Sequence, residues 1–314
     1  MRVALLHSVR MPVRGYGGTE RVVVWLARGL AEAGHEVVVL APSGTRIPEA
    51  TVVPLDPRQS RTRGFDLRRH LPKEVDIVHA HFPLEPPPGV PLVWTLHGLG
   101  GSDAPLAPNA IAVSRDHAAR HGLTGFVYNG LDPTEYTFSA TKGGYDLFLG
   151  RLDAVKGWRW AVDGAHRTGR ELVVAGGWRP TLRPGLRFVG EVSGYRKAEL
   201  LAGARCLWMP AQWDEPFGLT LIESLASGTP VLGTRRGALP EIITPAVGAL
   251  GDTVDELVSL RPEIEQIDPA ACRDRVERLF SHRAMTEGYL RMYRGFLADG
   301  ILPTVDPITP PALH

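Results

Sequence analysis

The sequence predicts an α/β protein of two domains, each built on a parallel β-sheet. Three observations lead to this fold class. A strand–loop–helix–strand pattern opens the chain over residues 3–40, and such βαβ units pair their strands in parallel. The alternation restarts after a small, polar, glycine-ended stretch at residues 137–144, which is the predicted linker. The length of 314 residues is that of two typical domains.

The first domain is predicted from short apolar runs that alternate with helical patterns. Residues 3–6 and 37–40 are apolar runs of the buried-strand type. The helix between them shows apolar residues at helical spacing and ends at Gly34. Further strands are expected at residues 77–78, 91–96, 110–113 and 126–128.

The second domain repeats this alternation. A helix is predicted at residues 158–167, and strands are predicted at residues 146–150, 171–175, 186–189, 206–209 and 230–233. A later helix carries an apolar stripe that ordinary core packing explains, formed by Met285, Tyr289, Met292, Tyr293 and Phe296. Residues 300–314 contain four prolines and little charge, so we expect an irregular tail.

Residues 213–223, with the sequence WDEPFGLTLIE, hold the main candidate site. Glu215 and Glu223 lie eight residues apart. Pro216 and Gly218 argue against one continuous helix, because proline lacks an amide donor and glycine loses backbone entropy. We therefore expect a loop that carries Glu215 and runs into a helix at residue 219 or 220, with Glu223 in the first turn.

A helix start of this kind can be read in two ways. Its unpaired amides and positive dipole end suit a phosphate, and the two carboxylates suit the hydroxyl groups of a sugar or ribose. Alternatively, Thr220 and Glu223 form a capping box, in which Glu223 only bonds an orphan amide. The sequence of this stretch is compatible with both interpretations, a ligand-binding site and a capping box.

Two cations follow the first predicted strand of the second domain. Arg151 and Lys156 lie at the carboxyl end of that strand, just before the helix at residues 158–167. The arginine could bind a diphosphate through two parallel N–H donors, and the lysine could bind it as a compact positive charge. The alternative is two solvated surface cations.

A glycine loop follows the first strand of the chain. Its pattern is Gly-x-Gly-Gly-Thr-Glu, with Glu20 in place of the third glycine of the dinucleotide fingerprint. The next strand ends without an acidic residue for a ribose. The loop therefore disfavours NAD and favours close approach of backbone to some other ligand, or a plain turn.

Three histidines, His79, His81 and His97, end two of the predicted strands. Ligands bind beyond the carboxyl ends of parallel strands, so these positions suit functional side chains. Each histidine alone is more often structural or solvent-facing. His97 is the best candidate, because Gly98, Gly100 and Gly101 follow it.

Composition excludes several classes of protein. The apolar fraction is 44% and the charged fraction 22%, and a net charge of +1 argues against a nucleic-acid-binding protein. Cys206 and Cys272, the only cysteines, suggest neither a disulfide framework nor a zinc site. The first apolar run is too short for a signal peptide or a membrane span, so a cytoplasmic location is expected, with peripheral membrane contact left open.

Together these motifs resemble glycosyltransferase family 4, retaining enzymes of the GT-B fold. The run from Glu215 to Glu223 is similar to the family's C-terminal signature, and Arg151 with Lys156 matches its phosphate-binding pair. The motifs at residues 17–20, 76–81, 95–98 and 129–132 follow in the expected order. The resemblance implies two Rossmann-like domains that face each other across a cleft. They would be an acceptor-side domain at residues 1–140 and a nucleotide-sugar domain at 145–282. A helix at 283–298 would pack back on the first domain, before an irregular tail at 299–314.

The resemblance implies a role for each matching residue. Arg151 and Lys156 would hold the donor diphosphate and stabilise the departing nucleotide. Glu215 would bond donor-sugar hydroxyls, Glu223 would bond the ribose, and His97 would lie at the sugar ring. The remaining donor contacts would come largely from backbone, at Gly17, Gly18, Val189, Gly190, Phe217, Gly218, Leu219 and Thr220.

The implied reaction moves a hexose from a nucleotide-diphosphate sugar, with UDP-glucose as the first choice, to a hydroxyl of a glycan, lipid or small molecule. The Asp-x-Asp metal motif is absent, so the two cations and the helix start would stabilise the leaving group, and neither a metal nor a cofactor is expected. The sequence shows no enzymic nucleophile, so the departing phosphate itself would take the acceptor's proton. The alternative is a nucleotide-sugar 2-epimerase of the same architecture. An idle binding subunit would be expected to lose some of these charged residues.

Overall fold

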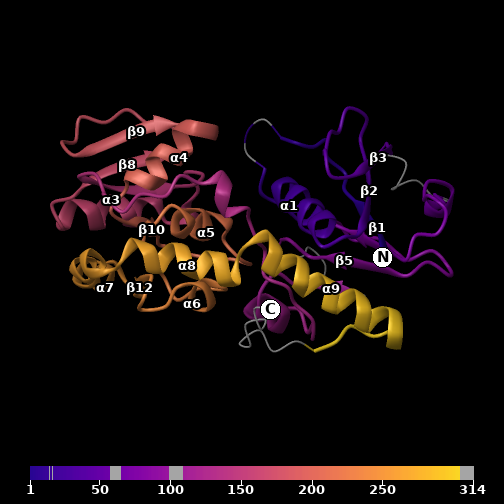
Figure 1. The fold of residues 1–314 in the computed structure, drawn as a ribbon. Helices are drawn as coiled ribbons and strands as arrows, with labels where there is room; N and C mark the ends of the chain where they lie inside the picture. The colour runs from indigo at the N-terminus through magenta and orange to yellow at the C-terminus, as the bar shows by residue number, and fades with distance from the viewer. Residues whose placement is uncertain (14, 16, 57–64, 99–108, 305–314) are drawn as a thin grey trace. The chain divides into compact units, whose positions relative to one another are not determined.

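A computed structural model describes residues 1–13, 15, 17–56, 65–98 and 109–304 of the chain. It divides into two compact units: Met1–Leu131 with Ser281–His314, and Asp132–Phe280 (Figure 1). The predicted linker at residues 137–144 lies within the second unit, and the predicted C-terminal helix lies in the first. Gly100, Gly101 and residues 305–314 of the predicted tail lie outside the described residues.

The first unit contains a six-stranded parallel sheet in the order β3-β2-β1-β4-β5-β6. Its strands are β1 (Arg2–Leu6), β2 (Glu36–Ala41), β3 (Thr51–Pro54), β4 (Ile77–Ala80), β5 (Leu92–Thr95) and β6 (Ala110–Ile111). The parallel pairing that the βαβ pattern predicted is confirmed by β1 and β2. The strand predicted at residues 126–128 is wrong, because only Phe126 pairs there, in a single bridge to Ala112.

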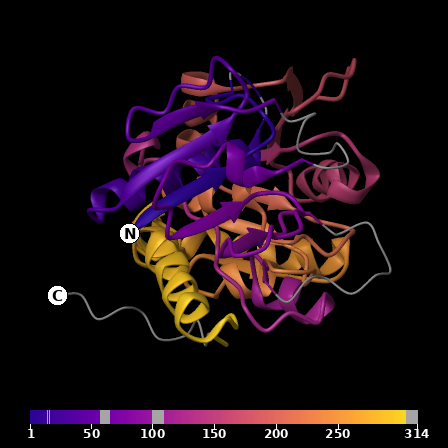
Figure 2. The same ribbon diagram turned by 90° about the vertical axis from the view of Figure 1, so that its right-hand side faces the viewer.

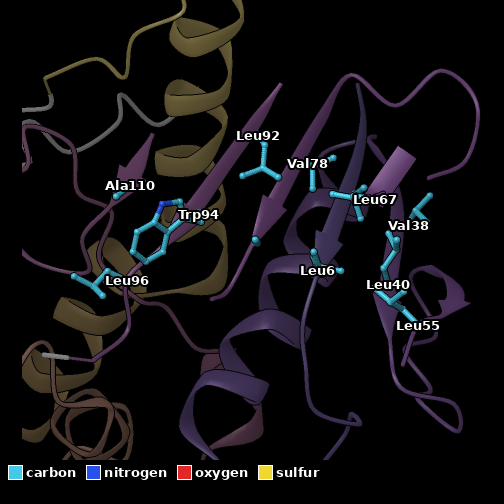
Figure 3. Packing of buried hydrophobic residues seen from close by; sticks show 12 residues of the cluster. Leu6, Val38, Leu40, Leu55, Leu67, Val78, Leu92, Trp94, Leu96 and Ala110 are labelled. Atoms are coloured by element: carbon cyan, nitrogen blue, oxygen red, sulfur yellow. The ribbon is translucent and has the colours of Figure 1, made fainter. Parts of the chain in front are cut away.

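One face of this sheet carries the core shown in Figure 3. Every second residue of a strand points to the same face, so Val38 and Leu40 share it, as do Leu92 and Trp94. Leu67, in the 3-10 helix η2 (Leu67–Arg69), packs against the same cluster.

Helices complete the first unit: α1 (Gly18–Glu32), α2 (Arg115–Arg120) and α9 (His282–Asp299), the long yellow helix of Figure 2. α9 packs closely on α1, since a Cβ on Gly29 would overlap Oγ1 of Thr286. The side chains of Tyr289 and Tyr293 on α9 reach His79 of β4, whose side chain lies on the face opposite Val78. The apolar stripe of this helix is thus core packing, as expected.

The second unit contains another six-stranded parallel sheet, in the order β12-β11-β10-β7-β8-β9. Its strands are β7 (Tyr145–Leu149), β8 (Glu171–Ala175), β9 (Leu186–Gly190), β10 (Leu207–Met209), β11 (Val231–Gly233) and β12 (Gly248–Leu250). Its helices are α3 (Trp158–Arg167), α4 (Gly194–Gly203), α5 (Leu219–Ala226), α6 (Leu239–Ile242), α7 (Val254–Leu260) and α8 (Pro269–Leu279), with 3-10 turns η3 (Pro133–Glu135), η4 (Ala154–Lys156) and η5 (Arg261–Gln266). The predicted helix at residues 158–167 is confirmed.

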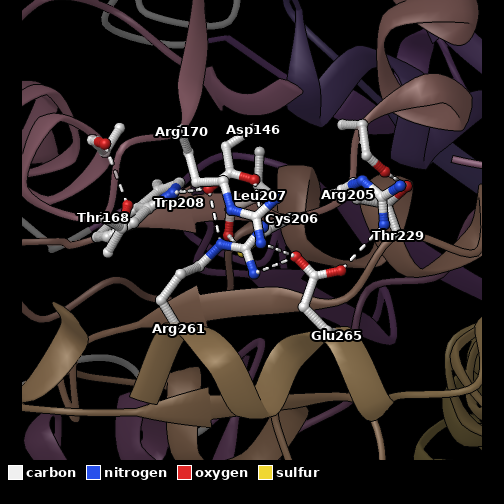
Figure 4. Close-up of polar contacts among 12 residues, drawn as sticks. Asp146, Thr168, Arg170, Arg205, Cys206, Leu207, Trp208, Thr229, Arg261 and Glu265 are labelled. Carbon is white, nitrogen blue, oxygen red and sulfur yellow. Dashed lines mark hydrogen bonds and ion pairs between the residues drawn. The ribbon is translucent and has the colours of Figure 1, made fainter. Parts of the chain in front are cut away.

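A buried charge network holds the centre of this sheet (Figure 4). Asp146 on β7 is fully buried and accepts two hydrogen bonds from Arg261, of 2.8 Å from Nε and 2.6 Å from Nη2. It also accepts a bond of 2.8 Å from the indole nitrogen of Trp208. Glu265 meets the other side of Arg261 at 3.1 Å. Because each buried charge is paired, the network ties β7 to the turn η5 instead of leaving an unpaired ion.

Candidate active site

The loop from β10 to α5 carries Glu215, and its shape depends on two glycines. Gly218 precedes α5 with a φ of 88°, a left-handed conformation that favours glycine. A Cβ on Gly237, which has a φ of 55°, would overlap the backbone nitrogen and oxygen of Glu215. The amide of Ala238 donates to the carbonyl of Glu215 at 2.9 Å. The predicted loop and the helix start at Leu219 are confirmed.

Lys156 and Trp213 hold the carboxylate of Glu215. Nζ of Lys156 lies 2.6 Å from Oε2 of Glu215, and the indole nitrogen of Trp213 donates to the same oxygen at 3.1 Å. Nζ also lies 4.5 Å from the centre of the Trp213 ring, in cation–π contact. Glu215 is 8% exposed. Both donors use Oε2, so Oε1 is the oxygen that remains to accept from a ligand hydroxyl.

Lys156 reaches this position because its loop is tightly packed. It ends η4, and Gly157 follows with a φ of 72°. A Cβ on Gly157 would overlap the carbonyl oxygen of Pro210, which lies in the loop that leads to Glu215. Arg151 is not brought to the same place: its Nε lies 3.2 Å from Asp153, and its side chain is 61% exposed.

Glu223 is buried at 3% exposure, where two side chains meet Oε1. Lys197 of α4 pairs with that oxygen at 2.7 Å, and the hydroxyl of Tyr136 donates to it at 2.9 Å. The capping-box alternative is wrong, because Gly218 caps α5 and has no side chain to form it. The placement of Glu223 in the first turn is also wrong, since it is the fifth residue of a helix that begins at Leu219.

The remaining second-unit candidates offer mainly backbone. The ring of Phe217 is 2% exposed and packs edge-on against Phe280, with ring centres 5.9 Å apart. Leu219 and Thr220 open α5, which no side chain caps. Val189 and Gly190 end β9, where Gly190 has a φ of 75° and its carbonyl accepts from the amide of Gly176 at 2.8 Å.

In the first unit, the candidate histidines lie at the carboxyl ends of β4 and β5. Nδ1 of His81 lies 2.9 Å from Nε2 of His97. His79 is fully buried and structural: Nδ1 lies 2.7 Å from the hydroxyl of Tyr293, and Nε2 lies 2.7 Å from that of Thr95. His7, which follows β1, has its ring centre 6.2 Å from that of His81.

These imidazoles are neutral at pH 7. Burial, the largest cause, and the nearby rings of His7 and His117 together lower the pKa of His97 to about 3. Burial also lowers the pKa of His79 to about 3. The pKa of His81 is lowered well below its usual value by burial and by its three histidine neighbours. As neutral rings, each can donate one hydrogen bond and accept another.

The glycine loop leads into α1. Gly17 is the N-cap and Gly18 is the first residue of the helix, and no side chain caps it. Gly17 is tightly packed, because a Cβ there would lie 2.6 Å from Cγ2 of Val13 and 2.9 Å from the Glu20 carboxylate. Its φ of 175° is extended, so space rather than backbone strain selects glycine.

Several side chains of these clusters carry no sequence signal. Lys197 and Tyr136 lie 26 and 87 residues from Glu223, and Gly237 belongs to a different loop from Glu215.

Among the residues that the structure describes, no group of three or more His, Cys, Asp or Glu side chains could hold a metal ion. None of the helices that the structure describes combines the length and the hydrophobicity of a membrane span.

Comparisons with known proteins agree with this arrangement. Residues 16–134 match the family model Glycosyltransferase Family 4, and residues 145–280 match Glycosyl transferases group 1. A phosphatidyl-myo-inositol mannosyltransferase of Mycolicibacterium smegmatis is 27% identical over 77% of this chain and 78% of its own length. One of Mycobacterium tuberculosis is 25% identical over 92% of this chain and 90% of its own length.

Solved structures extend the likeness to the whole fold. A glycosyltransferase involved in avilamycin A biosynthesis is 30% identical, with a TM-score of 0.77 over 96% of this chain and 99% of that one. The sucrose-phosphate synthase of Thermosynechococcus elongatus, 20% identical, has a TM-score of 0.66 over 95% of this chain and 99% of that one. The two matched family models, the similar enzyme and the two parallel sheets establish that this chain is a GT-B enzyme of glycosyltransferase family 4.

Proposed function

We propose that this glycosyltransferase moves a hexose from a nucleotide-diphosphate sugar to a hydroxyl acceptor, with retention of anomeric configuration and without a metal ion. The observation that carries the proposal is the Lys156–Glu215 pair of the second unit, in which Glu215 belongs to the loop that leads into the uncapped start of α5. A cation and the amides at a helix start can bind a diphosphate, and a carboxylate can accept hydrogen bonds from sugar hydroxyls.

The Lys156 ammonium has three donors, of which Glu215 takes one. The others can meet the diphosphate, so that phosphate binding does not require the ion pair to break. Oε1 of Glu215 would accept from hydroxyls of the donor sugar. The amides of Leu219 and Thr220, at the positive end of the α5 dipole, would stabilise charge on the departing phosphate.

The other family positions take supporting roles in the proposal. The side chain of Arg151, which is exposed in the loop after β7, would contact the diphosphate only when the donor is bound. Glu223 would bond the ribose, and the backbone of Val189 and Gly190 would meet the base. In the first unit, His97 would contact the sugar, and Gly17 and Gly18 would contact the phosphates.

The proposed chemistry uses the leaving group as the base. The C1–O bond to the phosphate breaks as the acceptor oxygen attacks from the same face. The acceptor's proton passes to the departing phosphate oxygen, so no enzymic nucleophile or metal is needed. Glu215, already bonded to Lys156 and Trp213, is better placed to orient the sugar than to attack it.

The proposed donor is a nucleotide-activated hexose. Two relatives are named mannosyltransferases, which favours a hexose. UDP-glucose is the donor that we propose first, and GDP-mannose is the alternative donor to test beside it. The same relatives act on phosphatidyl-myo-inositol by name, so a lipid-linked polyol is the first acceptor to test, beside glycans and small molecules.

The experiment is a screen of UDP-, GDP- and ADP-sugars by thermal shift and by release of the nucleoside diphosphate, with EDTA present. The proposal expects one base to be preferred and release to continue in EDTA. A strict requirement for a divalent metal would contradict the metal-free mechanism. Conversion of the donor into a second nucleotide sugar without acceptor would instead identify a 2-epimerase.

A further inference from the structure

His81 makes a direct contact with His97 that the family resemblance does not assign. His81 follows β4, and its Nδ1 lies 2.9 Å from Nε2 of His97, which follows β5. The ring centres lie 5.2 Å apart and the ring planes are inclined by 24° to each other. This contact fixes which nitrogen of His97 remains for a substrate: Nε2 is engaged, so Nδ1 is the one that can meet a ligand.

The other nitrogen of His81 determines where the protons lie. Nε2 of His81 is buried and has no hydrogen-bond partner among the residues that the structure describes. The whole residue is only 6% exposed. A buried N–H without a partner is rarer in proteins than a buried acceptor without one. The unpartnered nitrogen is therefore the one without a proton.

The protons of both rings follow from this assignment. A neutral imidazole carries one proton, so His81 has its proton on Nδ1 and donates it to Nε2 of His97. Nε2 of His97 is then an acceptor, and the proton of His97 lies on Nδ1. We propose that His81 is a positioning residue that holds His97 in its Nδ1–H tautomer, so that His97 presents a hydrogen-bond donor to the substrate.

The surroundings keep His81 in this orientation. The His79 ring packs against it with centres 4.3 Å apart, and the hydroxyls of Tyr293 and Thr95 hold both nitrogens of His79. The nearby titratable groups are His7 beside His81 and His117 beside His97, and Glu20 acts on His7. Burial keeps both rings of the pair neutral, as the assignment requires.

A donor at His97 has a specific chemical consequence. Nδ1–H can donate to a hydroxyl or ring oxygen of a neutral sugar, whereas a bare Nδ1 could only accept. The donor tautomer also adds no positive charge near an oxocarbenium-like centre, which a protonated ring would destabilise. This inference rests on the proposed contact of His97 with the donor sugar, but the tautomer itself can be measured without any substrate.

The test combines nitrogen NMR with kinetics. ¹⁵N–¹H long-range correlation spectra of the imidazoles report the tautomer of His97, whose signals are identified by their loss in H97Q. We expect Nδ1–H in the unmodified enzyme and Nε2–H in H81A, because isolated imidazoles prefer the latter. In H81N the side-chain amide stands near the position of Nδ1 and can donate to His97, so the Nδ1–H tautomer should return.

Kinetics then connect the tautomer to the reaction. H81A should lower kcat about tenfold, the effect of one hydrogen bond, while H81N should recover most of the loss. H166A, which removes an exposed histidine from α3, is the control. An Nε2–H tautomer in the unmodified enzyme, or an unchanged tautomer in H81A, would overturn the proposal. If the NMR result holds but no sugar donor is turned over, the proposed function fails and the tautomer assignment stands.

Discussion

Nζ of Lys156 lies 2.6 Å from Oε2 of Glu215, although the two residues are 59 positions apart. The contact joins the loop after β7 to the loop after β10, at neighbouring strands of the second sheet. The cation proposed to bind the diphosphate is therefore hydrogen-bonded directly to the carboxylate proposed to bind the sugar. A nucleotide sugar carries both a diphosphate and sugar hydroxyls, so it is the class of ligand that could contact Lys156 and Glu215 together.

Lys156 and Arg151 should differ in how they bind a nucleoside diphosphate. Lys156 is held in a nearly buried pair, whereas Arg151 is exposed, where water and salt screen its charge. Lys156→Met should weaken UDP or GDP binding by about tenfold or more, and Arg151→Met by less. Isothermal titration calorimetry at low and at moderate salt measures both. The Arg151 contribution should shrink more with salt; equal losses that respond equally to salt would contradict this ranking.

The histidines of the first unit predict acid sensitivity. His79 titrates near 6.5 when unfolded and at a pKa of about 3 when folded. Between these values the unfolded chain binds a proton that the folded chain does not, so stability falls as pH decreases. The fall is up to about 1.4 kcal/mol per pH unit for each such histidine.

Urea unfolding at several pH values between 7 and 5 tests this sensitivity. His79→Gln should make the dependence of stability on pH shallower, even if the variant is less stable overall through loss of its bonds to Tyr293 and Thr95. His166→Gln is the matched control for the loss of one histidine. The same slope in His79→Gln as in the unmodified protein would show that His79 does not carry the effect.

The Lys197–Glu223 pair should be strongly coupled. Glu223 is buried, so Lys197→Met removes the cation that pairs with its carboxylate and should cost about 3–5 kcal/mol of unfolding free energy. The double variant Lys197→Met/Glu223→Gln should recover part of that loss, because no buried charge remains. Chemical denaturation of the four proteins gives the coupling energy. Simple additivity of the two single changes would mean that the Lys197–Glu223 pair contributes no coupling energy to the fold.

Local patterns predicted a large part of the fold. The helix over residues 158–167 and the helix start at Leu219 were both found where the pattern placed them, because periodicity and glycine or proline signals are local. The short strands β3 and β12 were not predicted. β3 is only partly buried and β12 has three residues, so neither has a clear apolar period.

The contacts within the candidate site have no local sequence pattern. The sequence identified Glu215, Glu223 and Lys156, since these residue types stand in recognisable motifs. It could not reveal that Lys156 meets Glu215, that Lys197 and Tyr136 meet Glu223, or that His81 meets His97. Each of these contacts depends on which loops the sheet order places side by side.

The most direct test of the central claim is the rate of nucleoside diphosphate release from a sugar donor, measured in EDTA for the unmodified enzyme and for Glu215→Gln. Glutamine keeps the shape of the side chain and can still accept from Lys156 and Trp213, so the fold should be retained, although the nearly buried Lys156 loses its counter-charge and the thermal stability should fall. If Glu215 orients the donor sugar, release should fall by about a hundredfold or more in the variant, the scale of losing one transition-state contact. Equal rates in the two proteins would remove Glu215 from the site, and no release from any donor would contradict the proposed reaction.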